Sequence, residues 1–321
     1  MPKVSVIVPV YNAEKTLVAC ISNLVNQTLG DIELIFVNDA STDGSLRILM
    51  DCEKQFSDRV IIVDLDINSG PGGARNAGLL YASGDYIGFA DSDDMVDVTM
   101  YENLLKKAED ENADMVDAAY FDEASNTCIL QTSDGLCGEL DDEKRSELIA
   151  GGGYLWSRLF RQELFDGVKF RENAILEDME VMMELFMRTK VLANTHDVLY
   201  KYSAGDSSAS RPKDVMRYHD HIIKAMNAVG ACMEKYCGAD NGSLRMAFEY
   251  SIAHLYEGGL SNIVNSNTIE DKDALYRQLY DLMKQYITVA FGDNHFIMEK
   301  IPGNVRAVFE DVDRHFGSRE S

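Results

Sequence analysis

The sequence predicts an α/β fold in which a mainly parallel sheet is flanked by helices and followed by an all-helical C-terminal region. The chain has 321 residues, of which 46% are hydrophobic, so it can bury a large core. Up to about residue 120, short strand-like segments alternate with segments of helical spacing, which is typical of a parallel sheet covered on both faces. Beyond residue 212 only helical spacing recurs. We therefore expect a sheet domain at 1–212 and a helical region at 213–321.

The strands of the first region are short runs rich in valine, isoleucine and aromatic residues. Five are predicted, at Val4–Val8, Glu33–Asn38, Val60–Leu65, Tyr86–Ala90 and Met115–Tyr120. Between the first two, apolar spacing predicts a helix over about 17–25, and Ser41 or Thr42 can cap the next one. Because ligands of such sheets bind at the carboxyl ends of the strands, polar residues that follow strands are candidates for function.

The second half of the chain gives a mixed signal before it becomes helical. Residues 124–175 show no clear periodicity and contain three consecutive glycines at 151–153. A helix is predicted from Asp178 to about Arg188, then a strand at His196–Tyr202 and a loop at Ala204–Arg211. Three helices are expected in the C-terminal region, at 215–237, 244–265 and 274–290.

The formal net charge of −24 is unevenly distributed. Residues 213–321 carry 12 Lys and Arg and 16 Asp and Glu, a net charge of −4, so residues 1–212 hold the remaining −20. A surface this acidic argues against nonspecific binding to nucleic acid or to anionic lipid. A phosphorylated substrate would need a cation or well-placed hydrogen-bond donors to approach such a domain.

No targeting or membrane-spanning segment is apparent. No apolar run approaches the roughly 18 residues that a membrane span needs, and the strand-like Val4–Val8 leaves no room for a signal peptide. The six cysteines show no CxxC pairing, so we expect reduced thiols. The sequence therefore predicts a cytoplasmic protein.

Four polar clusters can each be explained structurally when taken alone. Pro9–Asn12 is typical of a turn. Asn38–Gly44 fits a helix N-cap that is followed by an acidic first turn. Asn68–Gly78 is glycine-rich and includes Arg75, whose guanidinium suits phosphate, but it matches neither the P-loop nor the dinucleotide-binding pattern. Glu177-Asp178 stands at an apparent helix start, where capping carboxylates are common.

A fifth cluster, Asp91–Asp94, places three carboxylates directly after the strand at Tyr86–Ala90. Oxygen ligands suit hard ions such as Mg²⁺ or Mn²⁺, which bridge protein carboxylates to a diphosphate. A solvated acidic loop is the alternative. An EF-hand does not fit, because Val96 stands where the glycine of that loop should be.

Taken in order, these clusters resemble glycosyltransferase family 2, the inverting enzymes of the GT-A fold, across about residues 3–205. The matching motifs are PVYN at 9–12, NDASTDGS at 38–45, N-x-G-x-x-x-A-R-N-x-G at 68–78, GDYIGFADSDD at 84–94, YLWSRLF at 154–160 and ED at 177–178. Asn38 and Ala40 replace the Asp and Gly that are usual in the second motif. Ser157 and Arg158 replace the usual Asn and Lys of the aromatic motif, directly after Trp156.

The resemblance implies a GT-A nucleotide-diphospho-sugar transferase fold and a single inverting displacement from a uridine-diphosphate sugar. The residues that it implies for the donor nucleotide are Pro9, Tyr11, Asn12, Asp39, Asn68, Arg75, Asp91 and Ser92. It implies that Asp91 and Asp93 hold Mn²⁺ or Mg²⁺. It also implies Asp178 as the general base, with Glu177 as the alternative, and Trp156 on the acceptor side.

The partners implied by the resemblance are a nucleotide-sugar donor and a glycan, lipid-linked glycan or polymer acceptor in cell-surface polysaccharide synthesis. Contact with the inner face of the membrane and self-association through the C-terminal helices are open. A sugar-nucleotide pyrophosphorylase would need a glycine-rich loop with Arg and Lys where Pro9–Glu14 stands. A catalytically inactive donor-binding or scaffold protein is the other alternative, because of Asn38.

Overall fold

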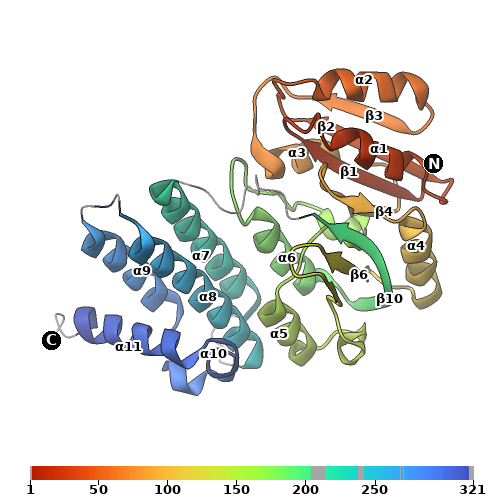
Figure 1. Cartoon of the computed structure of the whole chain (residues 1–321). Helices are drawn as coiled ribbons and strands as arrows, with labels where there is room; N and C mark the ends of the chain where they lie inside the picture. The colour runs from red at the N-terminus through yellow and green to blue at the C-terminus, as the bar shows by residue number, and fades with distance from the viewer. Residues whose placement is uncertain (1, 204–213, 238–241, 268, 270, 318–321) are drawn as a thin grey trace. The chain divides into compact units, whose positions relative to one another are not determined.

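The computed structural model of the chain describes residues 2–203, 214–237, 242–267, 269 and 271–317 (Figure 1). The chain divides into two compact units, one formed by Met1–Leu140 with Gly153–Ser208 and the other by Asp141–Gly152 with Ala209–Ser321. The segment 141–152, which the sequence placed in the sheet domain, is thus part of the second unit. The predicted boundary at 212 and the predicted loop at 204–211 lie outside the described residues.

The first unit is built on one mixed sheet. Its strands are β1 (Val4–Val10), β2 (Ile32–Asn38), β3 (Val60–Asp64), β4 (Tyr86–Phe89), β5 (Met95–Val96), β6 (Met115–Asp122), β7 (Thr127–Ile129), β8 (Gly138–Glu139), β9 (Arg158–Arg161) and β10 (Val191–Tyr202). The hydrogen-bonded order is β3-β2-β1-β4-β9-β6-β10-β5, with β7 beside β6 and β8 beside β10. Strands β3, β2, β1 and β4 are parallel, as are β6 and β10, but β9 is antiparallel to both β4 and β6. The predicted α/β class is confirmed, and the segment 124–175 makes the sheet mixed rather than mainly parallel because it inserts β9.

Helices cover both faces of the parallel strands. They are α1 (Leu17–Val25), α2 (Ser45–Gln55), α3 (Gly70–Leu79), α4 (Met100–Glu111) and α6 (Glu177–Arg188). Val6 and its alternate neighbours in β1 share a core with α1 and α4. Ile7 faces α3 instead, where a Cβ added to Gly78 would lie 2.5 Å from Ile7 Cγ2. The glycine therefore lets α3, which carries Arg75, lie close against β1.

Strand β10 is longer than the sequence predicted. It begins at Val191 rather than at His196. Its pairing with β6 shifts register between Asn194 and Val198, and His196 has a φ of 57°. This irregularity interrupts the alternation of inward and outward residues, so the first part of the strand has no recognisable pattern.

The second unit consists of helices in the residues that the structure describes. They are α5 (Asp142–Gly151), α7 (Val215–Cys237), α8 (Ser243–Asn265), α9 (Lys272–Tyr286), α10 (His295–Lys300) and α11 (Gly303–Gly317). Helix α8 packs against α5, α7, α9 and α10 through buried residues such as Phe248 and Tyr256. The third predicted helix ends at Tyr286 rather than near 290. Among the described helices, none has the length and apolar character that crossing a bilayer requires.

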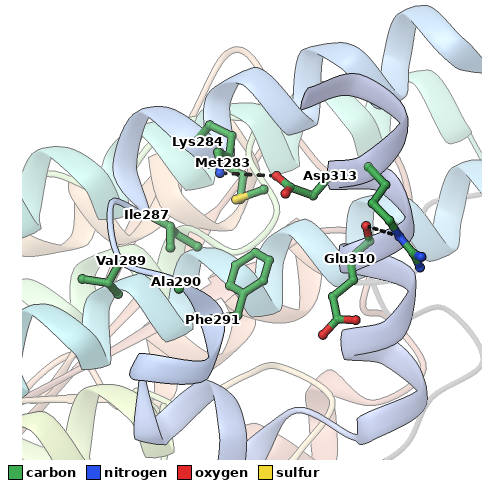
Figure 2. Close-up of a pocket in the computed structure, with 9 residues that line it drawn as sticks. Met283, Lys284, Ile287, Val289, Ala290, Phe291, Glu310 and Asp313 are labelled. Atoms are coloured by element: carbon green, nitrogen blue, oxygen red, sulfur yellow. Dashed lines mark hydrogen bonds and ion pairs between the residues drawn. The ribbon is translucent and has the colours of Figure 1, made fainter. Parts of the chain in front are cut away.

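A cavity of about 490 Å³ opens within the second unit between α9, the turn at Phe291–Asp293 and α11 (Figure 2). Its lining residues are Met283, Lys284, Ile287, Val289, Ala290, Phe291, Glu310, Asp313 and Arg314. Its charged groups already contact protein atoms: Lys284 Nζ lies 3.3 Å from Asp313 Oδ1, and Arg314 Nε donates to the Glu310 carbonyl. None of the candidate site residues belongs to this lining.

Candidate active site

Three neighbouring strands of the first unit, β2, β1 and β4, bring their carboxyl ends to one edge of the sheet. The clusters that begin at Tyr11, Asp39 and Asp91 follow these strands directly. Parallel strands therefore place together groups that are far apart in the sequence.

The loop after β1 is joined to the loop after β2 by hydrogen bonds. Asn12 has a φ of 49°; its backbone N–H donates to Ser41 Oγ at 3.0 Å, and its Oδ1 accepts from the Thr42 backbone N–H at 2.8 Å. Tyr11 beside it is 52% exposed, so its ring is available to a ligand. Pro9 lies within β1 opposite Val37, behind the loop.

Asp39 anchors the glycine-rich segment. Its side chain is 2% exposed, and Oδ1 accepts from the Ser69 backbone N–H at 2.7 Å. Its carbonyl accepts from Asn68 Nδ2 at 3.1 Å, so the Asn68 side chain stabilises the loop conformation. Burial raises the pKa of Asp39, although the hydrogen bonds from Ser69 and Gly70 act in the opposite direction.

Two departures from the family motif have local explanations in the structure. Asn38 Nδ2 donates to Asp64 Oδ1 at 2.7 Å, and an aspartate at 38 would instead face that carboxylate as a like charge. Ala40 has a φ of 55°, in the left-handed region that favours the glycine usual in the motif. Both replacements therefore concern the framework of the loop.

Arg75 connects the two carboxylate clusters. It is buried in α3, and its Nη1 donates to Glu177 Oε1 at 2.7 Å while Nη2 donates to Asp91 Oδ1 at 3.2 Å. The guanidinium that we expected to face phosphate thus contacts two carboxylates that are 86 residues apart in the chain. Sequence reasoning missed this bridge because no local pattern reports it.

The loop Asp91–Asp94 is tied to β10 through its last residue. Tyr200 Oη donates to Asp94 Oδ2 at 2.7 Å, and the Ser203 backbone N–H donates to Oδ1 at 2.8 Å. Burial and the charge of Asp91 raise the pKa of Asp94 to about 8. Asp94 therefore holds the loop in place, whereas Ser92 is half-buried and Asp93 is exposed.

The residues at this loop fit a hard divalent cation. Although Asp93 is exposed as a residue, neighbouring atoms partly shield its carboxylate from water; this shielding and then the charge of Asp91 raise the pKa of Asp93, and a cation would relieve the repulsion. Within the part of the chain that the structure describes, no three His, Cys, Asp or Glu side chains gather as a complete metal site. Mg²⁺ in nucleotide enzymes commonly takes one or two carboxylates and completes its shell with phosphate and water oxygens. Asp91 and Asp93 would supply the two carboxylates of such a site, and phosphate and water oxygens would complete it.

Glu177 and Asp178 open α6 but have different surroundings. Glu177 is buried against Arg75, and burial raises its pKa to about 7 although the Arg75 charge opposes the shift. Asp178 is half-buried; its Oδ1 accepts from the Met179 backbone N–H at 2.8 Å, and burial raises its pKa as well. Leu176 just before them has a φ of 69°, a strained conformation of a kind that is frequent at functional sites.

Trp156 lies inside an aromatic stack. It is 5% exposed, and the rings of Tyr154, Tyr200 and Tyr202 stack on it at centroid distances of 4.8, 4.6 and 5.4 Å. Tyr120 meets it edge-on. Tyr154 is 46% exposed and is the ring of this stack that reaches the surface. It was not singled out from the sequence. Its position two residues before the tryptophan was the only signal available.

Both departures in the aromatic motif, Ser157 and Arg158, lie in the core. Arg158 is fully buried, and its Nε lies 2.5 Å from Asp117 Oδ1. Its guanidinium also lies 5.2 Å from the ring centre of Phe186 in α6. Arg158 therefore supports the helix that carries Asp178.

Comparisons with known proteins bear on the family and the fold. The family described as Glycosyl transferase family 2 matches residues 5–163. The uncharacterized glycosyltransferase EpsJ of Bacillus subtilis is 30% identical over 305 residues, which cover 89% of this chain and 86% of EpsJ. The poly(ribitol-phosphate) beta-glucosyltransferase of Bacillus spizizenii is 44% identical over 97 residues, 29% of this chain and 15% of that protein. The structure of S. aureus TarS 1–349 in complex with UDP-GlcNAc has a TM-score of 0.76 at 19% identity, covering 97% of this chain and 88% of TarS 1–349.

Proposed function

The chain belongs to glycosyltransferase family 2, and we propose that it transfers a sugar from a uridine-diphosphate donor to an acceptor hydroxyl with inversion, assisted by Mn²⁺ or Mg²⁺. The observation that carries the proposal is the bridge from Asp91 through Arg75 to Glu177. It joins a carboxylate loop suited to a metal–diphosphate to a helix start that bears a second, half-buried carboxylate. A donor site and a proton acceptor thus share one fixed framework.

Support for the donor comes from the loops after β1 and β2. Asp39 is held by Ser69, and its position at the end of β2 suits a carboxylate that accepts from the ring N–H of uracil. The solved TarS complexes with UDP and UDP-GlcNAc share the fold and support a uridine nucleotide. Asp91 and Asp93 would hold the cation, which when bound neutralises negative charge on the departing diphosphate.

Support for the base comes from the contrast within α6. Glu177 is engaged by Arg75, which leaves Asp178 as the carboxylate better placed to accept a proton. The proton of the acceptor hydroxyl passes to the Asp178 carboxylate as the acceptor oxygen bonds to the anomeric carbon. The bond from that carbon to the diphosphate oxygen breaks, and uridine diphosphate leaves. General-base assistance of this kind typically contributes about 10²–10⁴-fold in rate.

The two alternatives, an inactive scaffold and a pyrophosphorylase, are less well supported than glycosyl transfer. Asn38 left room for an inactive scaffold, but its hydrogen bond to Asp64 gives it a structural reason. The family assignment leaves a pyrophosphorylase without support. Cytoplasmic location, contact with the inner membrane face and self-association through the C-terminal helices stay predictions.

The test is release of UDP from a UDP-sugar by the purified chain with Mn²⁺ and without an added acceptor. We expect slow hydrolysis that a chelator abolishes, since family 2 chemistry with water as acceptor needs the same groups. A protein that shows no hydrolysis with any of a panel of UDP-sugars would contradict the proposal.

A further inference from the structure

The aromatic stack reaches the surface at Tyr154. Its ring lies nearly parallel to Trp156, at 14°, and meets Tyr120 edge to face, while the residue remains 46% exposed. Trp156 in turn stacks on Tyr200, whose hydroxyl contacts Asp94. The exposed ring is thus rigidly connected to the carboxylate loop.

Tyr154 also lies near the candidate base. The preceding residue, Gly153, lies against Arg158, since a Cβ added there would be 2.5 Å from Nη1. That Nη1 lies 3.6 Å from Met182 Sδ in α6, the helix that begins with Glu177 and Asp178. Burial and then the negative charge of Asp178 raise the pKa of Tyr154, in keeping with this placement. The backbone N–H of Tyr154 donates to Gln131 Oε1 at 3.1 Å, which fixes the segment from a second side. A group resting on this ring would be held beside the carboxylate that we assign as proton acceptor.

The surroundings of this ring are acidic. The Arg75 bridge joins two acidic segments, Asp91–Asp94 and Glu177-Asp178, which together contain five carboxyl groups, and two of these contact Arg75. The region 1–212 as a whole carries a net charge of −20. An anionic acceptor would approach against this field, and no metal is assigned to the acceptor side to compensate for it.

We propose that Tyr154 is the acceptor platform and that this site selects an uncharged sugar ring, rather than a polyol phosphate chain, as the acceptor. The apolar C–H face of a pyranose matches a flat exposed ring, whereas an open-chain polyol phosphate offers no such face and adds negative charge. This inference rests on the proposed glycosyl transfer. It separates the chain from the relative whose printed name gives poly(ribitol-phosphate) as its substrate.

The experiment measures UDP release with a donor identified by hydrolysis, so the proposed function is tested before any acceptor is added. Two sets of acceptors are then compared at equal concentration: methyl β-glycosides of glucose, galactose and N-acetylglucosamine, and ribitol 5-phosphate with glycerol 3-phosphate. We expect at least one glycoside to raise UDP release above the hydrolysis rate and neither phosphate to do so. Acceleration by ribitol 5-phosphate, or by none of the glycosides, overturns the inference while the hydrolysis result stands.

Substitutions of Tyr154 provide a second test of the inference. Tyr154→Ala should raise the KM for the glycoside roughly tenfold, since the buried contact area is lost, and should not raise the KM for the donor. Tyr154→Phe keeps the ring and should stay within about threefold of wild type. Tyr81→Ala, at a tyrosine that is 53% exposed and outside the stack, is the matched control and should leave both constants unchanged. An unchanged glycoside KM in Tyr154→Ala would also overturn the inference.

Discussion

The two halves of the candidate site are built in different ways. The proposed donor side, Asp39, Arg75, Asp91 and Asp94, consists of polar groups already bonded to other parts of the chain. The proposed acceptor side, Tyr154 and Asp178, offers an exposed ring and a half-buried carboxylate. A fixed polar network suits a donor whose diphosphate must be held in one geometry, because preorganised groups need no rearrangement during the reaction. An exposed ring that stacks on a buried aromatic side chain suits acceptors that are bound mainly through shape complementarity.

The largest effect should come from the carboxylate of the proposed acceptor side. Asp178→Asn should lower kcat by at least about 10²-fold while donor affinity stays near wild type, because a proton acceptor is lost and no donor contact is. Glu177→Gln gives the matched comparison. If Glu177→Gln loses the activity and Asp178→Asn keeps it, the general base is Glu177 and our assignment is wrong. If Asp178 only caps α6, Asp178→Asn should keep the activity and lose little stability, because Asn caps helices as well as Asp.

The pH profile should agree with that assignment. Burial raises the pKa of Asp178, and only its ionised form can accept a proton, so kcat should fall as pH drops through a pKa above the usual carboxyl range of about 4. The acid limb should disappear in Asp178→Asn. An acid limb that Asp178→Asn retains would place the titrating group elsewhere.

A second effect should be on stability rather than on acceptor binding. Arg158→Ala leaves Asp117 buried without its ion-pair partner and should cost about 3–5 kcal/mol of unfolding free energy in urea titrations. Arg158→Lys keeps the charge and should cost less. If Arg158→Lys instead raises the acceptor KM with unchanged stability, the residue belongs to the acceptor side and the division between the two halves is misplaced.

The smallest effect concerns the loop after β2. Ala40→Gly should stabilise the protein by a few tenths to about 1 kcal/mol, because φ at 40 is positive and only glycine adopts it without steric cost. Ala77→Gly, at a helical position in α3, should destabilise it by about 0.5–1 kcal/mol. Thermal unfolding of both variants gives the comparison, and the same sign for both would contradict the explanation.

Local patterns predicted most of the sheet and the positions of the polar clusters. The runs that became β1, β2 and β4 are buried along nearly their whole length, and such strands are apolar enough to recognise. Strand β9 was missed because four residues in a stretch without periodicity give no signal. The first part of β10 was missed because a register shift breaks its alternation.

The candidate site was predictable residue by residue but not in its connections. Arg75 and Glu177 are 102 positions apart, and nothing near either residue indicates that they form an ion pair. The family resemblance implied Trp156 for the acceptor side, and in the structure its ring is buried in a stack whose exposed member is Tyr154. Contacts between distant segments depend on the tertiary fold, which short motifs do not contain.

The most direct test of the site is UDP release with and without metal in wild type and in Asp93→Asn. Asp93 is exposed, so the variant should unfold at the wild-type temperature. With UDP-glucose or UDP-N-acetylglucosamine and Mn²⁺, wild type should release UDP, excess chelator should stop it, and Asp93→Asn should be slower by at least about 10²-fold. Full activity of wild type in chelator, or of Asp93→Asn with metal, would contradict a metal-dependent transferase centred on this loop.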